Sequence, residues 1–151
     1  MKIFDCFMYF DEDIILDLRL NMLNQFIDYF IIVESTFNHR GEKRELKFDI
    51  KKYKKFEKKI IYLIFNEEPH GIEEVLNSDN DGEKSRKLIL NAAYRENGQR
   101  NFITKGLEFA NGNDLILLSD VDEIPNLKKI DWNTIDNQIV LFKQDMFYYK
   151  L

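Results

Sequence analysis

Residues 2–34, KIFDCFMYFDEDIILDLRLNMLNQFIDYFIIVE, contain two apolar runs separated by a helical pattern. The first run, 2–10, is dense in aromatic and β-branched residues and predicts a buried strand. The second, 29–34, is short and continuously apolar, which is typical of a central parallel strand that is covered on both faces. A strand, a helix and a strand in this order predict a βαβ unit with a right-handed crossover.

The segment between the two runs, 11–28, predicts a helix. Asp11 suits the N-cap position, and acidic residues directly after it are stabilised by the positive end of the helix dipole. Apolar side chains that recur at helical spacing predict the face that packs on the sheet. They are Ile14, Ile15, Leu18, Met22, Leu23 and Phe26.

The rest of the chain continues the alternation of strands and helices. We expect a polar loop at 35–48, a short lysine-rich helix at 49–59, a strand at 60–66 and a mobile surface loop at 67–87. A helix interrupted near Gly98 should follow at 88–110, then a strand at 115–119, a short helix or loop at 126–135, and a last strand or bent pair of strands at 138–151. This order indicates an α/β fold with a mostly parallel sheet flanked by helices. A length of 151 residues fits a single domain over 1–151.

The lysine-rich stretch 42–59 has two interpretations. Because Tyr53 and Phe56 are interleaved with lysines, it is compatible with nucleic-acid binding. It is equally a short amphipathic helix whose aromatic residues face inward while the lysines stay in water. The formal net charge of −5 and the pI near 5.1 favour the second interpretation, since nucleic-acid-binding domains are usually basic. We therefore expect no nucleic-acid partner.

The low number of cysteines and of long apolar segments indicates the cellular location. The single cysteine, Cys6, excludes an internal disulfide and fits a reducing compartment. The first residues lack the apolar segment and cleavage site of a signal peptide, and no stretch is long and apolar enough to span a bilayer. We expect a cytoplasmic protein without a membrane span.

The acidic motif LILLSDVDEIP, 115–125, follows an apolar run. In an extended chain Asp120 and Asp122 point the same way, roughly 6.5–7 Å apart. Ligands of open parallel sheets bind beyond the carboxyl ends of the strands, where this motif should lie. A divalent cation would relieve the repulsion between the carboxylates, and Mg²⁺ or Mn²⁺ suits carboxylates combined with phosphate oxygens. The alternative is that Asp122 or Glu123 caps a helix that begins at Pro125.

Three segments taken in order resemble glycosyltransferase family 17, the family of β-1,4-mannosyl-glycoprotein β-1,4-N-acetylglucosaminyltransferase. They are FDCFMYFDEDIILDLRLNMLNQFIDYFIIVEST (4–36), AYRENGQRNFITKGL (93–107) and DLILLSDVDEIP (114–125), and the ending MFYYKL (146–151) is similar to the aromatic run of that family. The resemblance implies a glycosyltransferase A-type, Rossmann-like fold. It also implies a UDP-sugar donor, with UDP-N-acetylglucosamine in the characterised branch, a glycan acceptor, and a metal of the Mn²⁺ type.

The same resemblance assigns roles to residues of this chain. Asp120 and Asp122 match the family's D-x-D, with Asp122 as a metal ligand and Asp120 aiding through water or the ribose. Glu34 matches the VEST position and would accept hydrogen bonds from the nucleoside, or would simply cap a neighbouring loop. Arg95 and Arg100 match an R-E-x-x-x-R element and would pair with the diphosphate as charge-assisted donors. Ordinary ion pairs on a surface helix are the alternative for both arginines.

Sugar transfer with inversion also needs a base for the acceptor hydroxyl. Asp145 is a candidate, because it follows the apolar residues of the last predicted strand, and a simple turn residue is the alternative. The family's catalytic region usually continues past the FYY element, so the chain is expected to be truncated at its C-terminus, with the acceptor side missing. An exposed apolar strand at that end would favour self-association.

Two other functions remain open. A non-catalytic or partner-dependent sugar-nucleotide-binding module would keep the fold without the acceptor site. A sugar nucleotidyltransferase would use a similar sheet, but it should carry a glycine-rich phosphate loop after its first strand. The corresponding stretch here, CFMYFDED (6–13), contains no glycine.

Overall fold

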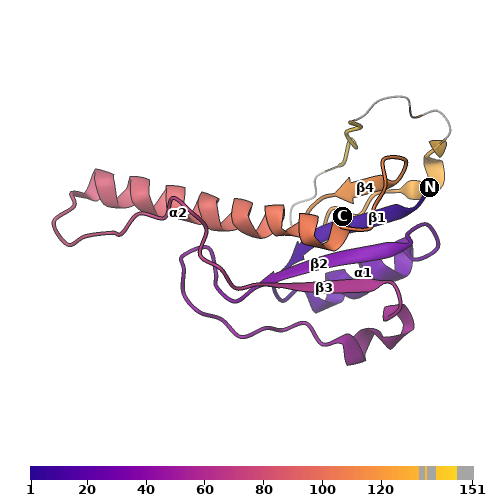
Figure 1. Ribbon diagram of the computed structural model, residues 1–151, viewed down its shortest axis with the longest axis horizontal. Helices are drawn as coiled ribbons and strands as arrows, with labels where there is room; N and C mark the ends of the chain where they lie inside the picture. The colour runs from indigo at the N-terminus through magenta and orange to yellow at the C-terminus, as the bar shows by residue number, and fades with distance from the viewer. Residues whose placement is uncertain (133–134, 136–138, 146–151) are drawn as a thin grey trace.

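The computed structural model describes residues 1–132, 135 and 139–145 of the chain. Within them, four parallel strands form one sheet in the order β3-β2-β1-β4, and helical segments cover both of its faces (Figure 1). The elements in chain order are β1 (Ile3–Tyr9), α1 (Asp13–Leu23), β2 (Tyr29–Ser35), η1 (Ile50–Phe56), β3 (Ile60–Phe65), α2 (Asp81–Phe102), η2 (Ile103–Leu107), β4 (Leu115–Leu118) and η3 (Leu127–Lys129), where η marks a 3₁₀ helix.

The predicted βαβ unit and the α/β fold class are confirmed. β1 pairs in parallel with β2 from Phe4↔Tyr29 to Tyr9↔Glu34, and β4 pairs with the other side of β1. The central strands are buried almost completely, as their continuous apolar sequence predicts. All four strands point the same way, so their carboxyl ends meet at one edge of the sheet.

The predicted inner face of the first helix is confirmed only in part: Leu23 is buried and Ile15 and Phe26 pack against the core, but the other three residues are exposed. Ile14, Leu18 and Met22 are 84%, 47% and 50% exposed, and the helix begins at Asp13 without a side-chain cap. The buried residues of α1 are Leu16, Arg19 and Leu20, which were not predicted, and Leu23, which was. The helix is rotated from its apolar pattern because the charged Arg19 points inward, where Asp5 of β1 binds its guanidinium.

The lysine-rich stretch forms the amphipathic segment predicted for it. Asp49 accepts a hydrogen bond from the backbone N–H of Lys51 and so caps η1. Tyr53 and Phe56 are buried, while the lysines between them are exposed. They join the core on the α1 face of the sheet, and α2 and η2 cover the other face.

The helix predicted to begin near residue 88 begins earlier, at Asp81, and Gly98 does not interrupt it. Asn80 and Glu83 form a capping box, in which each side chain accepts a hydrogen bond from the other residue's backbone N–H. The first half of α2 therefore extends beyond the sheet, where a loop had been expected (Figure 1). Its last turns lie over the sheet and continue into η2.

Gly106 of η2 lies directly on β2. A Cβ at this position would be 2.6 Å from Cγ2 and 3.0 Å from Cδ1 of Ile31. We expect Gly106→Ala to lower the free energy of unfolding by about 1–3 kcal/mol, the usual cost of overpacking. Urea denaturation measures this, with Gly112→Ala as the control, because a Cβ at Gly112 meets nothing within 4 Å. Equal stability of the two variants would contradict the close packing of η2 on β2.

The strand predicted over 138–151 is not formed in its described part. Residues 139–145 have no regular secondary structure, and 146–151, including the aromatic run, lie outside the described residues. Self-association through this strand therefore stays a prediction. In the described ranges, no helix is long and apolar enough to cross a membrane.

Candidate functional site

An open cavity of about 810 Å³ lies at the carboxyl ends of β1 and β4. This is the edge of the sheet at which ligands of parallel α/β folds bind. Its wall is built by five groups of residues from four parts of the chain that are distant in sequence. They contribute Met8, Tyr9 and Phe10; Glu12 and Ile15; Asn38, His39, Arg40 and Glu42; Glu96, Gln99 and Arg100; and Asp120, Val121 and Asp122.

The acidic motif forms a tight turn directly after β4. The backbone N–H of Glu123 donates to the carbonyl of Asp120 at 3.1 Å, and that of Ile124 donates to the carbonyl of Asp122 at 3.1 Å. Asp120 and Asp122 are exposed and line the cavity, whereas the side chain of Val121 is buried. The alternative of a helix N-cap is excluded, since the next helical turn, η3, has Asn126 at its N-cap position.

Arg100 brings a positive charge to this turn from the end of α2. Its Nη2 lies 3.2 Å from Oδ1 of Asp120 and 3.2 Å from Oε1 of Glu96. The side chain of Asp120 is 55% exposed, so the ion pair is accessible to solvent and can be separated at a low cost in free energy. The guanidinium of Arg100 is thus held at the acidic turn without being locked there.

The loop after β2 supplies two further side chains, His39 and Arg40, to which the sequence assigns no role. Asn38 shapes this loop, because its Oδ1 accepts hydrogen bonds at 3.0 Å from the backbone N–H groups of Arg40 and Glu42. Gly41 completes the turn with a φ of 86°, which glycine adopts without strain. Arg40 is exposed and lines the cavity, and no residue of the described ranges pairs with its guanidinium.

Comparison with known proteins decides the family. The family model described as Glycosyltransferase family 17 matches residues 1–140. The chain belongs to glycosyltransferase family 17. The match covers the sheet and every residue named above as lining the cavity, and it identifies the protein as a glycosyltransferase. No curated protein and no solved structure matches the chain.

Glu34 of this glycosyltransferase, unlike the acidic turn, does not line the cavity. Its carboxylate is fully buried and accepts hydrogen bonds from the backbone N–H groups of Lys47 and Phe48, at 2.7 and 3.1 Å, and from the Tyr62 hydroxyl at 2.7 Å. Burial, together with this hydrogen bond to Glu34, raises the pKa of Tyr62. Glu34 therefore fastens the 36–48 loop to the sheet; a contact with the nucleoside stays a prediction.

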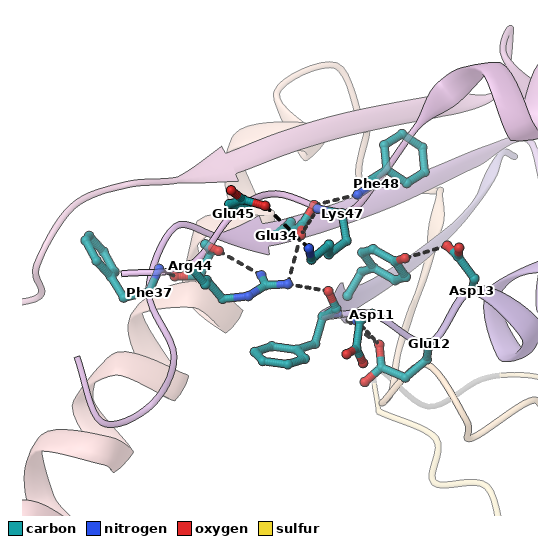
Figure 2. A network of polar contacts seen from close by, with 12 residues as sticks. Asp11, Glu12, Asp13, Glu34, Phe37, Arg44, Glu45, Lys47 and Phe48 are labelled. Carbon is teal, nitrogen blue, oxygen red and sulfur yellow. Dashed lines mark hydrogen bonds and ion pairs between the residues drawn. The ribbon is translucent and has the colours of Figure 1, made fainter. Parts of the chain in front are cut away.

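Arg44 connects this buried carboxylate to the cavity wall. Figure 2 shows it between Glu34, which it approaches at 3.1 Å, and the chain before Asp11. It also donates to the carbonyl oxygens of Ser35 and Phe10, and its guanidinium carbon lies 3.9 Å from the centroid of the Phe10 ring. Since Phe10 lines the cavity, the 36–48 loop and the end of β1 form one connected wall.

The two arginines of the family element are separated by the fold. Unlike Arg100, Arg95 does not line the cavity; it pairs with Glu68 at 3.2 Å and donates to the carbonyl of His39 at 3.3 Å. Arg95 thereby supports the loop that carries His39 and Arg40. Its predicted contact with a diphosphate stays a prediction.

Asp145 is exposed, lies in the irregular segment 139–145 and is not among the residues that line the cavity. Its role as the base is a prediction that no contact tests. Two titratable groups of β1, Cys6 and Tyr9, are poor candidates for proton transfer. Burial raises the pKa of the Cys6 thiol, and burial with a hydrogen bond to Asp13 raises that of Tyr9, so both stay neutral near pH 7.

The acidic turn fits a divalent cation that shares its coordination with a substrate. Asp120 and Asp122 offer hard, exposed oxygen donors, which suit Mn²⁺ or Mg²⁺. Among the described residues, no group of three or more acidic, histidine or cysteine side chains could hold a metal alone. Magnesium-like ions are commonly bound through one or two carboxylates plus phosphates and water, which is the arrangement this cavity permits.

Proposed function

We propose that the chain is a metal-dependent glycosyltransferase with a glycosyltransferase A-type fold. In this proposal it transfers a sugar, N-acetylglucosamine, from a UDP-sugar to a glycan acceptor with inversion. The observation that carries the proposal is the cavity at the carboxyl ends of parallel strands, which is lined by the exposed carboxylates of Asp120 and Asp122 and by two arginines, Arg40 and Arg100. Its volume of about 810 Å³ lies in the usual range for small-molecule sites.

The acidic and the basic residues of the cavity have different roles in this proposal. Asp120 and Asp122 would hold Mn²⁺ or Mg²⁺, which when bound neutralises the charge that develops on the departing diphosphate. Arg100 and Arg40 line the same cavity and, in this proposal, would donate charge-assisted hydrogen bonds to phosphate oxygens. A base must remove the proton of the acceptor hydroxyl, and Asp145 remains the candidate for this step.

Replacing Arg100 should change the affinities for two ligands in opposite directions. Arg100→Met should weaken Mn²⁺-dependent UDP binding roughly 10- to 100-fold, the value of a hydrogen bond to a charged group. The same variant should bind Mn²⁺ alone up to about fivefold more tightly, because Asp120 loses a competing cation. Calorimetry measures both affinities.

The control for Arg100 is Arg86→Met, on the same helix but paired with Glu73 at 2.8 Å, away from the cavity. It should change neither affinity. If Arg100→Met weakened the binding of both ligands together, Arg100 would be supporting the fold of the site instead of competing for Asp120.

The proposal is tested by calorimetric titration of UDP and UDP-N-acetylglucosamine into the purified chain, with Mn²⁺ and with EDTA. Binding that requires the metal supports a sugar-nucleotide site, and equal binding in EDTA contradicts metal dependence. CDP, GDP and ADP in parallel titrations define the base preference. Transfer to a glycan acceptor then distinguishes an enzyme from a module that only binds the donor.

A further inference from the structure

Arg19 is a charged residue in the centre of the core. It lies on α1, its side chain is 0% exposed, and it does not line the cavity. Asp5 of β1 binds it through two parallel hydrogen bonds, from Nε to Oδ2 at 2.8 Å and from Nη2 to Oδ1 at 2.7 Å. The guanidinium carbon also lies 4.6 Å from the centroid of the Phe7 ring. Asp5 thus fixes the orientation of the whole guanidinium plane.

The remaining donors of Arg19 all reach the acidic turn. Nη2 donates to Oγ of Ser119 at 2.7 Å. Nη1 donates to three carbonyl oxygens, those of Asp120 at 2.7 Å, Val121 at 3.1 Å and Glu123 at 3.2 Å. One side chain therefore binds four consecutive or nearly consecutive residues of this turn, all from the side that faces the core.

These bonds determine which side of the turn faces the cavity. The carbonyl groups converge on Arg19 from one side, together with the buried Val121 side chain. The carboxylates of Asp120 and Asp122 are left on the other side, where they line the cavity. A short turn with three acidic residues among five would otherwise sample several conformations, since like charges in it repel one another.

The burial of Asp5 and Arg19 is poorly explained by stability alone. A buried ion pair gains little over apolar side chains of the same volume, because desolvation offsets the attraction. What apolar side chains cannot do is bind several carbonyl oxygens in fixed directions. The planar fork of an arginine can, and lysine, with a single ammonium group, cannot reproduce it.

We propose that Arg19, oriented by Asp5, is a positioning residue of the active site. It holds the backbone of residues 119–123 so that the carboxylates of Asp120 and Asp122 face the cavity together. This inference rests on the proposed function, because the orientation matters only if both carboxylates bind the metal–nucleotide complex. Arg19 itself touches neither the cavity nor a ligand.

The test compares three variants of the full chain. The double variant Asp5→Leu/Arg19→Met removes both charges and keeps the core filled. Arg19→Lys keeps a positive charge without the fork. Leu23→Ala, at the buried end of the same helix remote from the cavity, is the control for general loss of packing. If the double variant does not fold, Arg19→Lys still decides the question.

The first measurement is amide hydrogen exchange, which needs no ligand. In the double variant and in Arg19→Lys, the amides of Glu123 and Ile124 should exchange about tenfold faster or more, as in a locally opened segment. Amides in the middle of β1 and β2 should keep their wild-type order of protection. In Leu23→Ala, the exchange rates of Glu123 and Ile124 should not rise more than those of amides elsewhere in the chain.

The second measurement is the affinity for UDP in the presence of Mn²⁺. Loss of a residue that orients metal ligands typically weakens binding roughly 10- to 100-fold. We expect this loss in the double variant, a smaller one in Arg19→Lys, and none in Leu23→Ala at a temperature where it is folded. An unchanged exchange rate in the turn, or unchanged affinity in a variant whose turn has loosened, would overturn the proposal. Wild-type protein that does not bind Mn²⁺ and UDP would instead overturn the proposed function, and hydrogen exchange alone would then decide whether Arg19 holds the turn.

Discussion

Asp122→Ala is expected to reduce Mn²⁺-dependent binding of UDP and sugar transfer more than any other single substitution at the cavity. Losing a residue that only orients a metal ligand already costs roughly 10- to 100-fold, so losing a ligand should cost on the order of 100-fold or more. Asp122 is exposed, and no described residue pairs with its carboxylate. The fold should therefore be unaffected, which thermal denaturation checks.

Two further variants show whether the effect belongs to the site. Asp120→Ala should weaken binding less, because Asp120 is assigned a contact through water or the ribose and already shares its charge with Arg100. Glu108→Ala removes an exposed carboxylate that lies before β4, at the opposite end of that strand from the cavity, and should leave binding unchanged. Normal metal-dependent binding by Asp122→Ala would rule out the acidic turn as the metal site.

Arg19→Met alone is expected to have the largest effect on stability. The substitution leaves the fully buried carboxylate of Asp5 without its partner, and three carbonyl groups of the acidic turn lose a donor. Breaking one side of a buried ion pair typically costs about 3–5 kcal/mol. Urea denaturation should show this loss in the free energy of unfolding, and most of it should return in Asp5→Leu/Arg19→Met.

The comparison of single and double variants separates two sources of the loss. If the double variant is as unstable as Arg19→Met, the cost comes from the turn and not from the unpaired charge of Asp5. A loss below about 1 kcal/mol in Arg19→Met would contradict the buried pair altogether, because such a value is typical of exposed ion pairs.

The parallel sheet could be predicted from the sequence because its strands are continuous apolar runs. The position of Asp120 and Asp122 followed from the same reasoning, as the end of a parallel strand fixes which edge its next residues reach. Two details of α1 were predicted less well: its N-cap is Glu12 and not Asp11, and three residues of its predicted inner face are exposed. The pattern Ile14, Leu18, Met22 has helical spacing, but the burial of Arg19 depends on Asp5, which lies fourteen residues earlier on another element.

Other differences have local or tertiary causes. The start of α2 carries a readable signal, the capping box of Asn80 and Glu83, which the polar character of the surrounding sequence concealed. His39 and Arg40 had no local signal for a role in the site. They reach the cavity because Asn38 and Gly41 shape their loop and Arg95 supports it, and only the folded chain brings these residues together.

Paramagnetic broadening of backbone amide resonances by Mn²⁺ in the presence of UDP tests the central claim most directly, because it locates the metal in the folded chain. We predict selective loss of signal, reversed by EDTA, at Asp120–Asp122, Arg100 and His39, while Lys54 of η1, on a different part of the surface, keeps its intensity. Broadening centred elsewhere, or none at saturating UDP and Mn²⁺, would contradict the assignment of this cavity as the metal and sugar-nucleotide site.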